Sequence, residues 1–231
     1  MHKSVQISAT FLIFLGLLGC GGEKTARPPD SPPPPPPVEA PDRTTTDERE
    51  PSDIRMGWQK PFDVIKSLGD LEEKVVVDLG AGMGYFTFKL LPKSKKVIAV
   101  DIDEERLEIL KGFKSSLGKN QQEKLDVRLV SPEDPGLIEQ EADVILIVNT
   151  ITYIDPLLPY VKNLKRFLKP GGRLHIVDFK SKHMPSYVSA PDIQNRIILY
   201  ELEDILEEAG FNKIYTDDTT LDFQYMVTAV L

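Results

Sequence analysis

The sequence is poor in cysteine and histidine. Its 231 residues include one cysteine, Cys20, so no disulfide can form within the chain and the fold must rely on its hydrophobic core. The three histidines are His2, His175 and His183, and none has a partner at the spacing of zinc ligands. We therefore expect no metal site, and no Ser-His-Asp catalytic set can be assembled from the sequence.

The sequence also lacks a basic stripe. The net charge is −8, and lysines and arginines are scattered along the chain rather than gathered on one segment. A surface that binds nucleic acid needs a concentration of positive charge. The charge pattern therefore argues against nucleic acid as a partner and favours a small-molecule, lipid or protein substrate.

The apolar run near the N-terminus is too short to span a bilayer comfortably. Val5 to Leu18 follows Lys3 and leads into Leu17-Leu18-Gly19-Cys20. A short apolar run behind a positive charge is typical of a signal peptide. The Leu-x-Gly-Cys ending resembles the lipobox of bacterial lipoproteins, which implies cleavage after Gly19 and attachment of lipid to Cys20.

The lipobox resemblance predicts where the protein resides. Residues 1–19 would be removed as a lipoprotein signal peptide, and the lipid on Cys20 would be the only anchor to the bacterial cell envelope. Gly21, rather than an aspartate, follows the cysteine, which favours the outer over the inner membrane. The alternatives are a plain cleaved signal peptide and a mis-assigned start, with Met56 as the first residue.

Residues 20–55 have the composition of a linker. Pro32 to Pro37 is an uninterrupted proline run, and Thr44 to Glu50 is polar and charged. Such a segment cannot bury enough apolar surface to offset its chain entropy, so we expect it to be disordered. The prolines favour polyproline II, at about 3.1 Å per residue. We expect a tether that holds a domain off the membrane; the alternative is a docking site for a proline-binding partner.

The most informative segment is Val75 to Tyr85, which reads V-V-V-D-L-G-A-G-M-G-Y. The three valines indicate a short buried strand, which ends in Asp78 and then three alternating glycines. A glycine turn between a strand and a helix lets a ligand approach backbone N–H groups. The G-x-G-x-G spacing differs from the G-x-G-x-x-G of dinucleotide sites, and the acid suits a ligand amino group rather than a pyrophosphate.

A second acid follows a second apolar strand. Val97 to Val100 leads into Asp101, and an acid at the tip of the neighbouring parallel strand can accept hydrogen bonds from ribose hydroxyls. With these two signals the chain resembles the class I S-adenosylmethionine-dependent methyltransferases.

Further motifs of that family occur in the family's order. Ala142 to Asn149 resembles its fourth strand, and Leu168 to Asp178 resembles its "LkPGG" turn and fifth strand. Glu201 to Phe211 resembles the helix before the last hairpin. The resemblance covers roughly residues 56–231, which we expect to form one domain that is monomeric or weakly associating.

The resemblance and the alternation of apolar strands with amphipathic helices predict an α/β fold. We expect a Rossmann-like, doubly wound, mostly parallel sheet with helices on both faces and a C-terminal antiparallel strand. The expected strands lie near 75–79, 97–101, 126–130, 143–148 and 173–178, with a closing hairpin at 214–215 and 223–230. The expected helices lie near 61–69, 84–91, 104–116, 156–168 and 200–209.

The family resemblance also implies a site for S-adenosylmethionine. Asp78 is expected beneath the glycine loop, near the methionine end of the cofactor. Asp101 is expected at the ribose, with Ile102 packing on the adenine. The residues alone leave helix caps as alternative roles for the acids and an ordinary turn for the glycines. Close approach of the cofactor is expected of three glycines: Gly80, Gly82 and Gly84.

The segment after the third strand departs from the family pattern. Family members often carry Gly-Asp-Ala-Glu-Asp, with the first aspartate near the adenine edge, whereas this chain has Ser131-Pro132-Glu133-Asp134. Ser131 and Pro132 are therefore expected beside the adenine, with a hydroxyl in place of the carboxylate. Asp134 either substitutes for that carboxylate or caps the following turn.

Asn149 ends the fourth strand. Because the carboxyl ends of the strands open on the ligand crevice in this fold, we expect Asn149 and Thr150 near the transferred methyl group. The alternative is a turn residue that bonds its own backbone.

No catalytic residue is predicted. The cofactor itself drives methyl transfer, and the protein supplies geometry and, for an acidic nucleophile, a base. Asp155 also fits the N-cap of the next helix. His175 is expected to be structural, and Trp58 to pack an N-terminal helix over the crevice. The candidates near the crevice are Tyr85, Tyr153, Asp155 and His183.

The leading hypothesis is methyl transfer from S-adenosylmethionine by a membrane-tethered domain to a small-molecule, lipid or protein acceptor. It contains a conflict, because this cofactor is made in the cytosol and the signal peptide directs the domain out of it. The alternative is a non-catalytic methyltransferase-like module that binds a nucleoside-like ligand or a partner protein. A nicotinamide-dependent oxidoreductase is a third hypothesis, against which the glycine spacing and Asp78 count.

Overall fold

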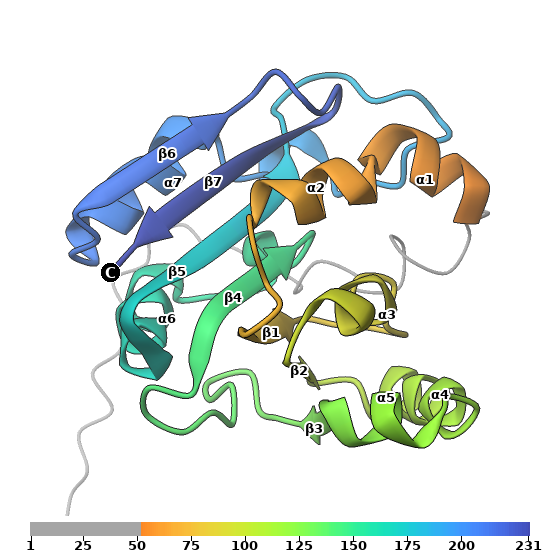
Figure 1. The fold of residues 1–231 in the computed structure, drawn as a ribbon. Helices are drawn as coiled ribbons and strands as arrows, with labels where there is room; N and C mark the ends of the chain where they lie inside the picture. The colour runs from red at the N-terminus through yellow and green to blue at the C-terminus, as the bar shows by residue number, and fades with distance from the viewer. Residues whose placement is uncertain (1–51) are drawn as a thin grey trace, which may run out of the picture. The chain divides into compact units, whose positions relative to one another are not determined.

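The computed structural model of the protein describes residues 52–231 (Figure 1). The predicted signal peptide, Cys20 and the predicted tether up to residue 51 lie outside the described residues. Within residues 52–231, no helix is long and apolar enough to cross a membrane.

A seven-stranded sheet forms the centre of the described residues, with the order β3-β2-β1-β4-β5-β7-β6. Neighbouring strands from β3 to β5 are parallel, whereas β7 runs antiparallel to both β5 and β6. The predicted Rossmann-like sheet with a C-terminal antiparallel strand is therefore confirmed. The strands are β1 (Val75–Leu79), β2 (Lys96–Asp101), β3 (Leu125–Leu129), β4 (Ala142–Val148), β5 (Leu168–Phe179), β6 (Lys213–Asp217) and β7 (Gln224–Val230).

Helices cover both faces of this sheet (Figure 1). The α-helices are α1 (Ser52–Gln59), α2 (Pro61–Ser67), α3 (Thr87–Leu90), α4 (Glu104–Ser115), α5 (Lys119–Lys124), α6 (Leu157–Leu164) and α7 (Leu199–Glu208). Short 3-10 turns are η1 (Leu91–Lys93), η2 (Ile151–Tyr153), η3 (Lys165–Phe167) and η4 (Ile193–Asn195).

Alternating side chains of the central strands build two core layers. Val76 of β1 belongs to the layer shared with α2, α3 and α4, and Val77 belongs to the layer shared with α6 and α7. Both valines are fully buried, and each contributes about 1.5–3 kcal/mol by leaving water. Because β1 is held on both faces, the loop that follows it starts from a fixed point.

Helix α1 begins at Ser52. Several other elements differ from the prediction, and helix α5 (Lys119–Lys124) was not expected at all. The helix predicted at 84–91 is reduced to α3 and η1, because the chain up to Phe86 stays in turns. Asp155 is not a helix N-cap: that position belongs to Pro156, and no side chain caps α6.

Candidate functional site

The glycine loop after β1 has a backbone that side chains would disturb. Gly80, Gly82 and Gly84 have φ angles of 78°, 54° and 93°, in the left-handed region that favours glycine. A Cβ on Gly80 would also overlap the side chain of Thr150, which follows β4. The loop after β1 and the loop after β4 are therefore in contact at the carboxyl edge of the sheet.

Asp78 lies at the end of β1, beneath this loop. Its side chain is 3% exposed, and its Oδ2 accepts a hydrogen bond from Thr87 Oγ1 at 2.6 Å. Burial raises the pKa of Asp78 to about 6, while the Thr87 hydrogen bond opposes that rise and the charge of Asp101 adds to it. The carboxyl group is thus mostly ionised at neutral pH and easily protonated just below it.

Asp101, at the end of β2, is bonded to the glycine loop. Its Oδ2 accepts from the Gly82 N–H at 2.7 Å, and its Oδ1 accepts from the Asp103 N–H at 3.0 Å. Asp103 in turn caps α4 by accepting from Arg106 N at 3.1 Å. Asp101 thus joins β2, the glycine loop and the start of α4, and each oxygen keeps a second lone pair for a ligand. Ile102 beside it is 36% exposed.

The loop after β3 carries the residues predicted beside the adenine. Ser131 and Pro132 are both exposed. Ser131 Oγ accepts from Asp134 N at 3.2 Å, and Asp134 Oδ1 accepts from Gly136 N at 3.0 Å. Of the two roles left open for Asp134, the structure therefore shows the cap of the following turn.

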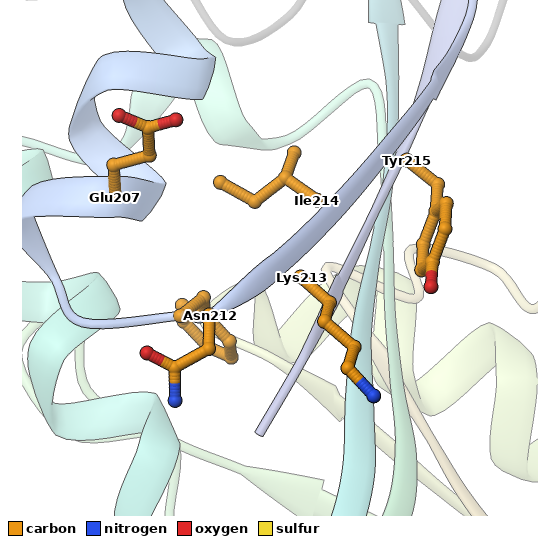
Figure 2. Close-up of a pocket in the computed structure, with 6 residues that line it drawn as sticks. Glu207, Asn212, Lys213, Ile214 and Tyr215 are labelled. Atoms are coloured by element: carbon orange, nitrogen blue, oxygen red, sulfur yellow. The ribbon is translucent and has the colours of Figure 1, made fainter.

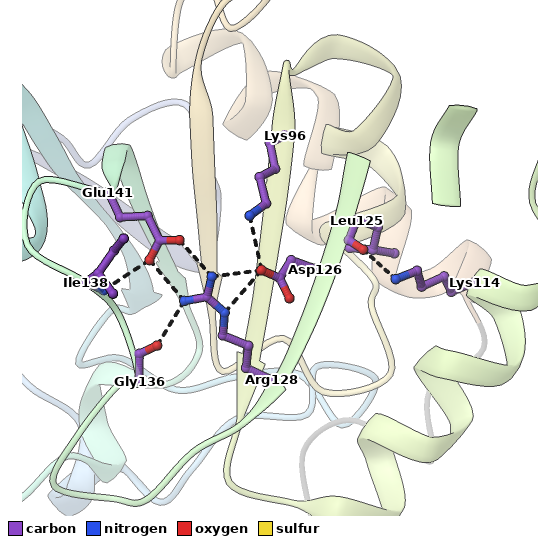
Figure 3. Close-up of polar contacts among 8 residues, drawn as sticks. All are labelled: Lys96, Lys114, Leu125, Asp126, Arg128, Gly136, Ile138 and Glu141. Atoms are coloured by element: carbon purple, nitrogen blue, oxygen red, sulfur yellow. Dashed lines mark hydrogen bonds and ion pairs between the residues drawn. The ribbon is translucent and has the colours of Figure 1, made fainter. Parts of the chain in front are cut away.

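A charged cluster fixes the course of this loop (Figure 3). Arg128 of β3 donates to both carboxylate oxygens of Glu141, at 2.7 and 3.0 Å, and to the Gly136 carbonyl at 2.9 Å. It also donates to Asp126, which Lys96 of β2 contacts at 3.1 Å. The middle and the end of the loop are thus bound to β3, which holds the Ser131 segment at the carboxyl edge.

Asn149 lies at the end of β4 with a φ of 56°, and its backbone N–H donates to the Val177 carbonyl. Its side-chain Oδ1 accepts from the amide groups of Gln59, at 3.4 Å, and Gln224. Asn149 therefore joins a cluster with α1 and β7 instead of bonding its own turn. Gln59 and Gln224 were not predicted as site residues, and both are fully buried.

Arg55 of α1 is a third residue that the sequence did not indicate. It is 9% exposed, and its guanidinium lies 4.0 Å from the ring centroid of Tyr85, which follows Gly84. Lys89 Nζ lies 3.6 Å from the same centroid. Burial lowers the pKa of Arg55 to about 10, so it remains a cation at neutral pH. Helix α1 therefore brings a buried positive charge to the glycine loop.

The remaining candidates differ in their exposure. Tyr85 and Tyr153 are half-buried at the carboxyl edge, whereas Asp155 and His183 are exposed. Trp58 is buried against Phe179 and Val188, so it anchors α1 to the end of β5 and the loop after it.

His175 has the structural position that the sequence predicted. It is 1% exposed and bonds Ser67 of α2 and Thr228 of β7 at 3.1 and 2.8 Å. Burial lowers its pKa to about 4, so it is neutral at physiological pH.

A cavity of about 500 Å³ lies elsewhere, at the edge of the sheet. Residues of α7 and β6 line it, including Glu207, Lys213 and Tyr215 (Figure 2). None of the predicted cofactor residues takes part, so this cavity is separate from the glycine-loop site. Among residues 52–231, no group of three or more metal-ligating side chains is gathered.

The sequence profile described as "Methyltransferase domain" matches residues 77–174, from β1 through the glycine loop into β5. A structure described as a SAM-dependent methyltransferase from Aquifex aeolicus superimposes with a TM-score of 0.67 at 25% identity. That alignment covers 79% of this chain and 99% of that one. Residues 77–174 thus match a methyltransferase domain, and the fold is that of S-adenosylmethionine-dependent methyltransferases.

One curated relative matches part of this chain, and one further solved structure shares its fold. Demethylmenaquinone methyltransferase of Lactococcus lactis is 32% identical over 130 residues, which are 54% of this chain and 50% of that protein. The chain thus spans half or less of the length of the curated relatives that it matches. The [4+2]-cyclase SpnF has the same fold, with a TM-score of 0.59, 12% identity, and coverage of 74% and 80%. Similarity of fold does not by itself fix the reaction.

Proposed function

We propose that the protein transfers a methyl group from S-adenosylmethionine to a small-molecule, lipid or protein acceptor. One observation carries this proposal: the acids that end β1 and β2 converge on one glycine loop, where Asp101 accepts the N–H of Gly82. A ligand bound over that loop meets backbone donors and two carboxyl groups at once.

The residues fit the chemistry of the cofactor. Its ammonium group would be stabilised by the charge of Asp78, which lies beneath the loop. Its ribose hydroxyls would donate to the free lone pairs of Asp101, and its adenine would pack on the exposed side of Ile102. Gly80, Gly82 and Gly84 would let it contact the main chain, with Ser131 and Pro132 beside the adenine and Asn149 at the methyl end.

The bound cofactor supplies an electrophilic methyl group on a sulfonium. The protein's residues bind and orient it, and the loops after β4 and β5 border the place where an acceptor would approach. Tyr85 and Tyr153 are half-buried residues at that edge, and neither is assigned as a base.

The cellular setting forms part of the proposal. A lipid on Cys20 would anchor the chain to the bacterial envelope, and the proline-rich segment would tether the domain to it. The support is the sequence pattern of residues 1–20 together with the proline-rich composition of the segment that follows.

The competing function is a tethered binding module without turnover, favoured by the conflict between export and a cytosolic cofactor. Calorimetric titration of the purified full-length protein with S-adenosylmethionine and S-adenosylhomocysteine tests the cofactor site. Release of labelled methyl groups onto acceptors from cell fractions then separates enzyme from binding module. Absence of binding at millimolar ligand would reject the methyltransferase proposal, and binding without any transfer would favour the module.

A further inference from the structure

Three side-chain amides and one arginine form a continuous series of hydrogen bonds at the carboxyl edge of the sheet. The amides are buried or half-buried. Arg55 Nε donates to Gln59 Oε1 at 2.6 Å, and Gln59 Nε2 donates to Gln224 Oε1 at 3.1 Å. The Nε2 atoms of Gln59 and Gln224 both donate to Asn149 Oδ1. Gln59 and Gln224 are completely buried, so water cannot replace these contacts.

Arg55 fixes the orientation of each side-chain amide in this hydrogen-bond series. A side-chain amide can present either its oxygen or its nitrogen, but a guanidinium can only donate. Gln59 must therefore turn its oxygen to Arg55 and its nitrogen to the other two amides. Those two amides must then present their oxygens to Gln59, since a buried donor facing a donor is unfavourable.

The hydrogen-bond series ends at the side-chain NH2 group of Asn149, which has no acceptor among residues 52–231. Because Asn149 Oδ1 is occupied by two N–H groups, both hydrogens of its Nδ2 remain, and no residue in the described part of the chain accepts either one. Asn149 is half-buried, and the next residue, Thr150, lies against Gly80 of the glycine loop. The two hydrogens are therefore held next to the place where the ligand would bind.

We propose that Arg55 is a positioning residue that, through Gln59, fixes Asn149 as a hydrogen-bond donor to an oxygen of the bound ligand. The inference rests on the proposed function and adds a specificity to it. A ligand oxygen is accepted at this point, and an N–H group is disfavoured. The oxygen can belong to the carboxylate of the cofactor or to the methyl acceptor.

The test uses the purified full-length protein and isosteric variants. Asn149→Asp keeps the oxygen that Gln59 and Gln224 need and replaces the NH2 group by an acceptor. Gln59→Glu keeps the oxygen facing Arg55 and replaces its NH2 group by an oxygen, so Asn149 must turn over. Arg55→Lys keeps a group that can only donate, whereas Arg55→Met does not. Thr228→Val removes a part-buried hydrogen bond outside this series, to His175, and is the matched control.

Three measurements are made on each variant. Calorimetry gives the affinity for S-adenosylhomocysteine and for 5′-methylthioadenosine, which lacks the amino-acid end. Transfer of labelled methyl groups to cell fractions gives activity, and circular dichroism verifies the fold. A wild type that binds neither nucleoside contradicts the proposed function itself, whereas a difference confined to the variants concerns this inference.

If the oxygen is the cofactor's carboxylate, Asn149→Asp, Gln59→Glu and Arg55→Met weaken S-adenosylhomocysteine binding at least tenfold. Their affinity for 5′-methylthioadenosine then stays within about twofold of wild type, as do both affinities of Thr228→Val. If the oxygen belongs to the acceptor, both affinities are kept and transfer falls at least tenfold in the same variants. In either case Arg55→Lys retains most of the function. The inference is wrong if Asn149→Asp lowers affinity or transfer while Gln59→Glu and Arg55→Met do not. It is also wrong if all the variants are folded and neither affinity nor transfer changes.

Discussion

At the scale of single residues, Asp78 experiences two opposed influences. Burial raises its pKa to about 6, whereas a bound ammonium group would favour the ionised form and lower that pKa again. A group that must lose its proton for the ligand to bind makes the affinity depend on pH.

We predict that affinity for S-adenosylhomocysteine falls about tenfold between pH 7 and pH 5. The free protein holds a proton on Asp78 below its pKa of about 6, and binding must remove it. Asp78→Asn should bind weakly and with a flat profile over that range. Calorimetry at several pH values measures both, and a flat profile for the wild type would remove Asp78 from the site.

Asp101 is predicted to act on the ligand more than on the fold. Asp101→Ala removes an acceptor for two ribose hydroxyls and should weaken S-adenosylhomocysteine binding by roughly 1.5–3 kcal/mol. The control is Asp103→Ala, which deletes the cap of α4 and should cost about 1 kcal/mol of unfolding free energy while leaving affinity unchanged. Equal loss of affinity in the two variants would mean that Asp101 acts only by supporting the loop.

At the scale of elements, the contact between the loops after β1 and β4 depends on the missing side chain of Gly80. Gly80→Ala places a methyl group against Thr150 at a φ of 78°. We predict that the unfolding free energy falls by about 2–4 kcal/mol and that the ligand affinity also falls.

The control for that substitution lies in α4. Gly112 has nothing within 4 Å of an added Cβ, so Gly112→Ala should stabilise the protein by about 0.5–1 kcal/mol through helix propensity. Urea denaturation measures both variants. Similar effects at the two glycines would show that the loop tolerates a side chain.

The same elements show what the sequence could and could not predict. Strand β1 follows from its valines, and Asp101 from its place at the end of β2, because both signals are local. Helix α5 was missed because it buries none of its residues and so has no apolar periodicity. Gln59 and Gln224 are separated by 165 positions, and a contact of that range leaves no pattern in one sequence.

At the scale of the whole molecule, two buried groups affect stability in opposite senses as pH changes. Burial raises the pKa of Asp178, at the end of β5, to about 7, so its stabilising effect is present at low pH and lost as pH rises towards 7. The lowered pKa of His175, about 4, gives stability that is present above pH 6.5 and lost as pH falls to 4.

Asp178→Asn isolates the first of these effects. The variant's unfolding free energy relative to wild type should increase by roughly 2–4 kcal/mol between pH 4 and pH 8. The difference removes the contribution of His175, since both proteins contain it. Denaturation of both proteins at the two pH values measures this difference in unfolding free energy. A difference that stays constant would show that Asp178 is ionised over the whole range.

The proposed anchor is tested on the intact chain. Cys20→Ser removes the thiol that would carry the lipid, so the variant should leave the membrane fraction or remain uncleaved. Fractionation and gel mobility compare it with wild type. If both behave alike, the lipoprotein assignment fails and a start at Met56 becomes the better explanation.

The antiparallel strand β7 has a consequence for the order in which the protein can be made. It lies between β5 and β6 and is the last strand of the sheet in the chain. Among the described strands β6 has β7 as its partner, and Gln224 of the amide cluster also lies on β7. During synthesis, the sheet therefore stays incomplete until residues 224–230 have left the ribosome. The edge of β5 therefore stays unpaired, and open to pairing with other chains, until β7 docks on it.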